Sequence, residues 1–155
     1  KRQPGLENLR IHWVAPEIGI RESVTVVGKK TVQRQDYETG QRFEDALCYA
    51  FYPIDIHGMD SNEWQAWPLE KGVVPTVPRG ALLPRHTRHL CIAGRCISSD
   101  RLANSGLRVE ANAMAMGQAS GAMAALAAEK GCDPEELELP ELRKTLRDYG
   151  AIVPG

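Results

Sequence analysis

The stretch HLCIAGRCISSDRLANSGLRVEANAMAMGQASGAMAALAA, residues 89–128, decides the fold. It begins with a short apolar run at residues 90–93, which predicts a strand that ends at Gly94. Residues 98–106 are rich in Ser, Asp, Asn and Gly, a composition that predicts a polar turn. From about Leu107 the sequence predicts one long helix, and its residues 111–128 carry no charged side chain. We therefore expect protein to enclose this helix nearly all round.

Small residues gather on one side of the predicted helix. Gly117 and Gly121 share a stripe with Ala113, Ala124 and Ala128. Glycine costs about 1 kcal/mol relative to alanine inside a helix, so two glycines indicate that the missing side chain matters there. The stripe predicts that another backbone approaches the helix closely.

The beginning of the predicted helix offers a place for negative charge. The first turn of a helix has unpaired backbone N–H groups and a partial positive charge, which suit an anion or a carbonyl-rich ring edge. We place these donors between Gly106 and Glu110, with Asn104 or Ser105 as the N-cap. An ordinary buried helix that follows a simple connecting loop is the alternative.

Four segments, in the same order along the chain, carry a resemblance to a known family. The longest is AGRCISSDRLANSGLRVEANAMAMGQASGAMAA (residues 93–125), and the upstream ones are IGIRESVTVVG (18–28), FEDALCYAFYPIDIHG (43–58) and VPRGALLPR (77–85). Together they resemble the C-terminal, flavin-binding part of bacterial FAD-dependent oxidoreductases of the glutathione-reductase-like superfold. The resemblance covers most of the chain, and the block from GRCISS to MGQASG is its most specific part.

The resemblance implies FAD as the cofactor and a small organic molecule as the substrate. It implies that Gly94 and Arg95 lie near the ribityl and pyrophosphate part of FAD, and that Arg108 and Val109 meet the pyrimidine edge of the flavin ring. A positive helix end there favours the anionic reduced flavin and raises its potential. The further candidates for cofactor contact are Ser105 and Gly106, at the predicted helix start.

The family's GxGxxG strand–turn–helix, which holds the ADP half of FAD, has no counterpart in this sequence. The chain also begins at Lys1 without an initiator Met. We therefore expect a C-terminal fragment of a larger enzyme, in which a missing N-terminal dinucleotide-binding part completes the FAD site. Alone, the chain is expected to hold FAD weakly or not at all and to be inactive.

The expected fold class is α+β. Residues 1–88 are predicted to form an antiparallel, β-rich part of a substrate or cap domain, with strands at 9–14, 20–27, 46–52 and 73–77. Residues 89–155 are predicted to add the strand and the long buried helix of an incomplete FAD-binding domain. Shorter helical segments are expected at 33–39, at 78–84, from Asp133 onward, and at 140–149.

Two groups of residues are candidates for the substrate site. Asp55 and His57 lie two residues apart and so share one face of an extended segment. A carboxylate there could orient the imidazole, which would make His57 a general acid or base at neutral pH. A structural histidine that bonds backbone after a turn is the alternative. Arg21 and Arg79 are candidates for binding an anionic substrate, with surface salt bridges as the alternative.

Other functional classes are less well supported by the sequence. His86, His89, Cys91 and Cys96 could suggest a small zinc-binding domain, but Cys96 lies beyond Gly94, so no metal site is expected. Six arginines between residues 79 and 108 have no aromatic residues between them, and the net charge is −1, so nucleic acid is not an expected partner. A non-enzymatic, self-associating interaction module remains an alternative, and a homo-oligomer is possible because the long helix could be left partly uncovered.

Cysteine usage and hydropathy bear on location. The four cysteines form no CxxC pair and no apolar signal segment is present, so we expect reduced thiols and a cytoplasmic protein. Residues 111–128 have about the length of a membrane span, but Asn112, Gln118 and Ser120 interrupt them. We interpret this stretch as a core helix, and no membrane partner is expected.

Overall fold

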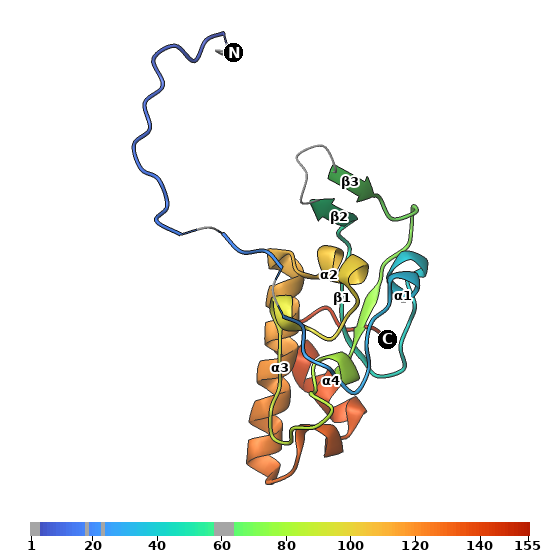
Figure 1. Ribbon diagram of the computed structural model, residues 1–155. Coiled ribbons are helices and arrows are strands. Elements are labelled where there is room, and N and C mark those ends of the chain that lie inside the picture. Colours follow the sequence, from blue (N-terminus) through green and yellow to red (C-terminus); the bar gives the residue numbers. More distant parts are fainter. Residues whose placement is uncertain (1–3, 18, 23, 58–63) are drawn as a thin grey trace.

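The computed structural model describes residues 4–17, 19–22, 24–57 and 64–155 (Figure 1). It contains helices together with two small antiparallel sheets, which confirms an α+β fold. A long helix, α3 (Glu110–Lys130), runs along one side of the body. Residues 4–17 and 19–22 belong to an N-terminal arm, whose first part extends away from the body.

Helix α1 (Arg34–Thr39) forms where the sequence predicts a helical turn. Gln33 and Asp36 make a reciprocal capping box at its beginning, and Gly40 ends it in the left-handed conformation with φ 67°. The buried ring of Tyr37 points from this helix into the core.

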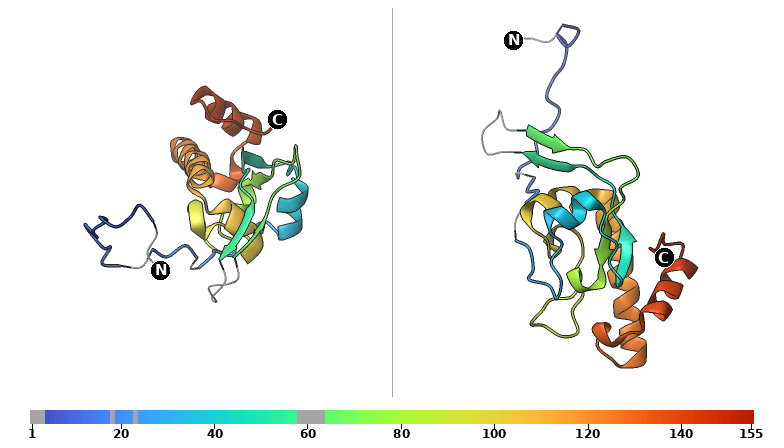
Figure 2. Two further views of the ribbon diagram at one scale, coloured as in Figure 1. Left: turned by 90° about the horizontal axis from the view of Figure 1, so that it is seen from above. Right: turned by 90° about the vertical axis from the view of Figure 1, so that its right-hand side faces the viewer.

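Each sheet has two antiparallel strands. In one, β1 (Ala46–Tyr49) pairs with β4 (Thr76–Pro78), and an irregularity lies between Ala46 and Cys48. In the other, β2 (Ile54–His57) pairs with β3 (Trp64–Trp67). Figure 2 shows the β2–β3 pair at one end of the body. The strand predictions at 46–52 and 73–77 are confirmed at β1 and β4, with shifted ends.

The strands predicted at 9–14 and 20–27 are wrong for the described residues of these segments, which form no strand. Residues 9–14 alternate apolar and polar side chains, but Ile11 and Trp13 are 83% and 73% exposed. A strand needs a neighbouring strand to complete its hydrogen bonds, and none of the described strands lies beside this segment. The arm joins the body further on, where the Val26 amide donates to the Cys96 carbonyl at 2.9 Å.

The polar turn predicted at 98–106 is a helix, α2 (Arg101–Leu107). Its N-cap is Asp100, whose Oδ1 accepts from the Ala103 amide at 2.8 Å. The other carboxylate oxygen accepts from the Arg34 amide, the first residue of α1, at 2.5 Å. One carboxylate therefore serves the beginnings of two helices.

The strand predicted at 90–93 is also wrong. This segment is extended but unpaired as a strand, and its Ile92 amide donates to the Leu82 carbonyl at 2.9 Å. A short 3-10 turn, η2 (Gly94–Cys96), follows it. A similar turn, η1 (Arg79–Ala81), confirms the helical turn predicted at 78–84.

After α3, the chain follows the predicted order. Gly131 ends α3 with φ 65°, and Asp133 caps a 3-10 turn, η3 (Pro134–Glu136). Helix α4 (Leu139–Asp148) then packs against α3 through buried Leu142 and Leu146. Its Arg143 donates to the carbonyls of Glu44 and Ala46, which fastens α4 to β1.

The core lies between α3, α2 and the sheet of β1 and β4, and Figure 2 shows these layers. Its largest fully buried side chains come from every part of the body: Tyr37, Leu47, Ile54, Leu82, Ile97, Leu107, Met116, Met123, Leu142 and Leu146.

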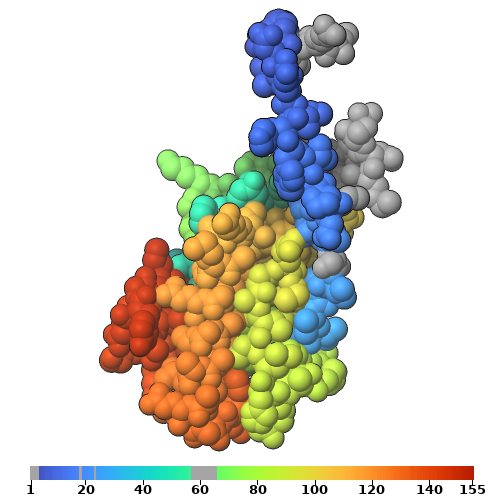
Figure 3. Space-filling view, turned by 90° about the vertical axis from the view of Figure 1, so that its left-hand side faces the viewer, coloured from blue at the N-terminus to red at the C-terminus, as the bar shows by residue number. Residues whose placement is uncertain are grey.

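The described residues cover α3 on one side only, so they do not supply the enclosure expected of this helix, and the helix is partly uncovered, as expected of the chain alone. Figure 3 shows much of α3 at the surface between α4 and the segment that precedes α2. Met114 is 68% exposed, and a β-carbon added to Gly117 or Gly121 would meet nothing within 4 Å. The backbone approach predicted at these glycines is not made by any described residue. None of the described helices combines the length and apolar character needed to cross a bilayer.

Candidate functional site

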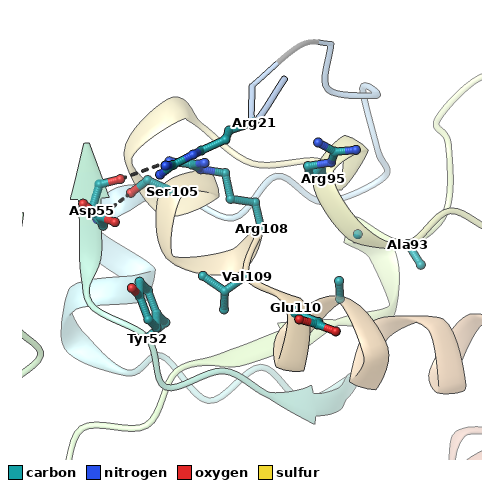
Figure 4. A pocket seen from close by; sticks show the side chains of 11 residues that line it. Arg21, Tyr52, Asp55, Ala93, Arg95, Ser105, Arg108, Val109 and Glu110 are labelled. Carbon is teal, nitrogen blue, oxygen red and sulfur yellow. Dashed lines mark hydrogen bonds between the residues drawn. The ribbon is translucent and has the colours of Figure 1, made fainter. Parts of the chain in front are cut away.

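A pocket of about 740 Å³ opens where α2 meets α3 (Figure 4). It gathers side chains from the arm, from the segment before β2, from β2 itself, from η2, and from both helices. Its lining residues are Arg21, Tyr52, Asp55, Ala93, Gly94, Arg95, Ser105, Arg108, Val109, Glu110 and Ala113. Seven of them are predicted site residues: Arg21, Asp55, Gly94, Arg95, Ser105, Arg108 and Val109.

The joint between the helices consists of two residues. Arg108 is the C-cap of α2, and Val109 is the N-cap of α3 but makes no side-chain capping bond. The first amides of α3, at residues 110–112, therefore remain available as donors at the positive end of a 21-residue helix. Because Val109 and Glu110 line the pocket, this helix end faces it. The long helix thus begins later than predicted, and Asn104 and Ser105 are not its cap.

Arg108 is the most enclosed cation of the pocket, with a side chain only 7% exposed. Its Nη2 donates to the Asp55 carbonyl at 3.2 Å and lies 3.5 Å from Glu22 Oε1. Its Nε is buried and has no partner among the described residues. A buried donor left without an acceptor costs about 1–3 kcal/mol, so Arg108 Nε is a costly group that the described residues leave unsatisfied.

Ser105 connects α2 to β2. It is almost fully buried, its Oγ donates to the Leu102 carbonyl at 2.7 Å, and it accepts from the Asp55 amide at 3.0 Å. Figure 4 shows this bond beside the one from Arg108 to the same residue of β2. The two bonds fix the position of Asp55 relative to the helix joint.

Gly94 and Arg95 form the opposite wall of the pocket. Gly94 has φ 77°, a conformation that favours glycine, and a β-carbon there would lie 3.8 Å from that of Ala113. The conformation, rather than lack of space, therefore explains the glycine. Arg95 is exposed, and its Nη1 donates to the Ile20 carbonyl of the arm.

Two predicted site residues lie elsewhere. Gly106 is buried under the ring of Tyr37 and does not line the pocket. The prediction placed it at the beginning of the long helix, but it lies in the last turn of α2. Arg79 donates from Nη1 to the Leu137 carbonyl at 2.7 Å, so it fastens η1 to the segment before α4.

His57 is the last residue of β2, and its side chain lies outside the described part of the structure. Asp55 and His57 both belong to β2, and the proposed pairing of their side chains stays a prediction.

Four pocket residues were not predicted as site residues: Tyr52, Ala93, Glu110 and Ala113. Tyr52 lies three residues before Asp55, and its carbonyl accepts from the Tyr37 hydroxyl at 2.7 Å. Glu110 is the first residue of α3 and places a carboxylate at the pocket. The available signal was that acidic residues favour the first turn of a helix, which would have placed the helix start at Glu110.

No three His, Cys, Asp or Glu side chains of the described residues come together in a way that could hold a metal ion. His89 lies near Asp133, with Nδ1 3.6 Å from Oδ2, and Cys96 bonds the Ala93 carbonyl instead. All four cysteines are free thiols. Burial raises the pKa of the Cys48 thiol to about 12.

Comparison with protein-family models matches residues 1–146 to the family described as FAD dependent oxidoreductase. Comparisons with curated proteins and with solved structures found no match.

Proposed function

Because the chain belongs to the FAD dependent oxidoreductase family, we propose that the pocket between α2 and α3 receives the flavin ring of FAD. The chain would then supply the ring-contacting helix end and part of the substrate site of an oxidoreductase. The observation that carries the proposal is the buried, unpartnered Nε of Arg108 beside the uncapped beginning of α3.

The residues present fit such a group. A flavin ring carries carbonyl oxygens on one edge, which need hydrogen-bond donors, and the pocket offers the first amides of α3 beside the positive charge of Arg108. Its volume of about 740 Å³ lies within the range typical of cofactor sites. Val109, Ala93 and Ala113 supply apolar surface for the ring to rest on.

The first amides of α3 would hold the carbonyl-bearing edge of the ring, with the positive charge of Arg108 beside it. Arg95 lies across the pocket from Asp55 of β2 in Figure 4, so Arg95 and its neighbour Gly94 would lie toward the ribityl and diphosphate chain. No GxGxxG segment is present, so the ADP half of FAD needs a part that this sequence does not contain.

When bound, FAD supplies the chemistry of accepting a hydride from a small organic substrate. The chain's own contribution is electrostatic, since the positive end of α3 and the Arg108 guanidinium offset negative charge at the ring edge. Arg21 would orient the substrate from the mouth of the pocket. We assign to His57, oriented by Asp55, the holding of a proton at its imidazole during turnover.

The test is an NMR titration of the full chain with riboflavin, which tests the ring site without the ADP half. We expect shifts in the Arg108 Nε–H and in the amides of residues 110–112 at millimolar ligand. The variant Arg108→Gln should lose this response, whereas Arg147→Gln, on the exposed face of α4, should keep it. A riboflavin response confined to the surface of α3 and α4, or no response at all, would overturn the proposal.

A self-associating interaction module is the second candidate. The exposed side of α3 favours it, because uncovered apolar surface on a helix is typical of an interface. This candidate predicts association without any response to flavin, so the same titration separates the two functions.

A further inference from the structure

We propose that Arg108 is the centre of a carboxylate-binding subsite, and that Glu22 of the arm covers this subsite until a ligand's carboxylate replaces it. The inference rests on the proposed function, because it assigns a carboxylate-bearing molecule as the substrate of the same pocket. The Arg108 guanidinium then binds the substrate's carboxylate, and the first amides of α3 hold the flavin edge. It also names residues 20–22 as a strap that must lift before the ligand can bind.

The first step concerns the hydrogen bonds of Arg108. The bond from Nη2 to the Asp55 carbonyl, at 3.2 Å, fixes the plane of the guanidinium. The guanidinium then has two N–H groups side by side, the second one on Nη2 and the one on Nε. Together they can donate to both oxygens of one carboxylate. In the structure Nε has no partner among the described residues, so this pair of N–H groups is not satisfied.

The second step concerns Glu22, which already brings a carboxylate to this pair of N–H groups. Its Oε1 lies 3.5 Å from Arg108 Nη2, and its Oε2 lies 3.3 Å from Arg101 Nε. The two oxygens are thus divided between two arginines, and neither reaches Arg108 Nε. Glu22 occupies the place of a carboxylate ligand but makes no hydrogen bond with Arg108 Nε. A free carboxylate can therefore form a better pair with Arg108.

The third step is how the strap is held. Arg95 donates to the Ile20 carbonyl, and Arg101 and Arg108 face Glu22, so arginines of the body hold residues 20–22 by polar contacts. The Arg101 side chain is 63% exposed, and exposed ion pairs are weak and screened by salt. Before the strap, the arm extends away from the body (Figure 1), so little else opposes its release.

The fourth step is the choice of a carboxylate over a phosphate. Glu22 shows that a carboxylate fits against Arg108. The pocket is also lined by the acids Asp55 and Glu110, which repel the second negative charge of a free phosphate group that Arg108 alone would have to hold.

The experiment uses the full chain and observes the Arg108 Nε–H by NMR while sodium acetate, sodium pyrophosphate or riboflavin is added. Acetate is expected to shift this signal, and trypsin cleavage after Arg21 should accelerate over the same acetate range, as the strap lifts. Glu22→Gln should bind acetate several-fold more tightly and should be cleaved rapidly without acetate. The control is Glu7→Gln, since Glu7 lies on the arm and contacts the Gly5 amide rather than the body.

Each outcome decides the proposal. An Arg108 signal unmoved by acetate, or equal acetate affinity in Glu22→Gln and Glu7→Gln, overturns it. Tighter binding of pyrophosphate than of acetate overturns the choice of a carboxylate. A response to riboflavin alone overturns the subsite and leaves the flavin proposal standing, whereas a response to acetate alone supports the subsite and counts against the flavin.

Discussion

The ring of Tyr37 lies so close to Gly106 that a β-carbon on this glycine would be 2.6 Å from both Cζ and the hydroxyl oxygen of the ring. Tyr37 is fully buried, and its hydroxyl donates to the Tyr52 carbonyl at 2.7 Å. The contact holds α1, α2 and the segment before β2 together. Since Gly106 lies in the body of α2, the tyrosine ring, not a special backbone conformation, requires the glycine.

Gly106→Ala is expected to destabilise the protein. Forcing a methyl group into this contact costs about 1–3 kcal/mol, more than the gain of about 1 kcal/mol from replacing a helical glycine. Urea unfolding followed by circular dichroism measures the change. Gly117→Ala is the matched control, because nothing lies within 4 Å of its added carbon, and this variant should be stabilised. Equal effects of the two variants would refute the contact.

Ser105→Ala is expected to loosen β2 from α2. The substitution leaves the Asp55 amide without its acceptor, at a cost of about 1–3 kcal/mol if no water replaces the hydroxyl. Hydrogen exchange should become faster at the Asp55 amide and stay unchanged at the Ala103 amide, which bonds Asp100 instead. Unchanged exchange at Asp55 would show that the bond contributes little.

Alkaline pH should destabilise the protein through Cys48. Burial raises the pKa of this thiol from its ordinary value of 9.0 to about 12, so between these values the unfolded chain loses a proton that the folded chain keeps. The free energy of unfolding therefore falls as pH rises above 9, by up to about 1.4 kcal/mol per pH unit. Burial raises the pKa of Tyr37 too, and adds a further fall at higher pH.

Cys48→Ala measures how much of the alkaline loss of stability comes from the thiol. The free energy of unfolding of the variant at pH 7.5 gives the effect of lost packing. Only its decrease with pH above 9 tests the titration. A flatter slope than in the original protein is expected from urea unfolding at several pH values. An unchanged slope would mean that Cys48 does not carry the effect.

The exposed side of α3 should make the chain self-associate. Ala125 and Leu126 line a groove of about 460 Å³ between α3 and α4, and Ala125→Glu would place a charge in it. We expect light scattering to show a concentration-dependent increase in mass that this variant reduces. Gln35→Glu, which adds the same charge on α1, should leave the association unchanged. A monomer at all concentrations would contradict the expectation.

The elements that local signals determine could be predicted from the sequence. Gly40 and Gly131 mark helix ends, and the spacing of Leu142 and Leu146 marks the buried side of α4. These signals depend on backbone conformation and on neighbours within one helical turn, so they do not require knowledge of the rest of the fold.

The wrong predictions concern segments whose structure depends on residues far away in the sequence. The alternation at 9–14 is typical of a strand, but only a neighbouring strand can make it one. Asn104 and Ser105 resemble turn residues, yet both are buried in α2, where Asn104 Nδ2 donates to Ser99 Oγ at 3.0 Å.

The candidate site was predicted only in part. The family resemblance pointed to Arg108 and Gly94 as cofactor contacts, and both residues line the pocket. Gly106 was misplaced because the joint at Arg108 and Val109 carries no glycine or proline to mark it. Tyr52 was missed because its position at the pocket depends on the path of the chain before β2.

The shared cap at Asp100 limits how the molecule can open. Because its carboxylate begins α1 through Arg34 and α2 through Ala103, separating these helices would uncap at least one of them. Helices α1 and α2 should therefore move together as one rigid unit, which includes Ser105 and Arg108, the C-cap of α2. In the proposed opening, residues 20–22 are the part that moves, while the two helices keep their positions beside the pocket.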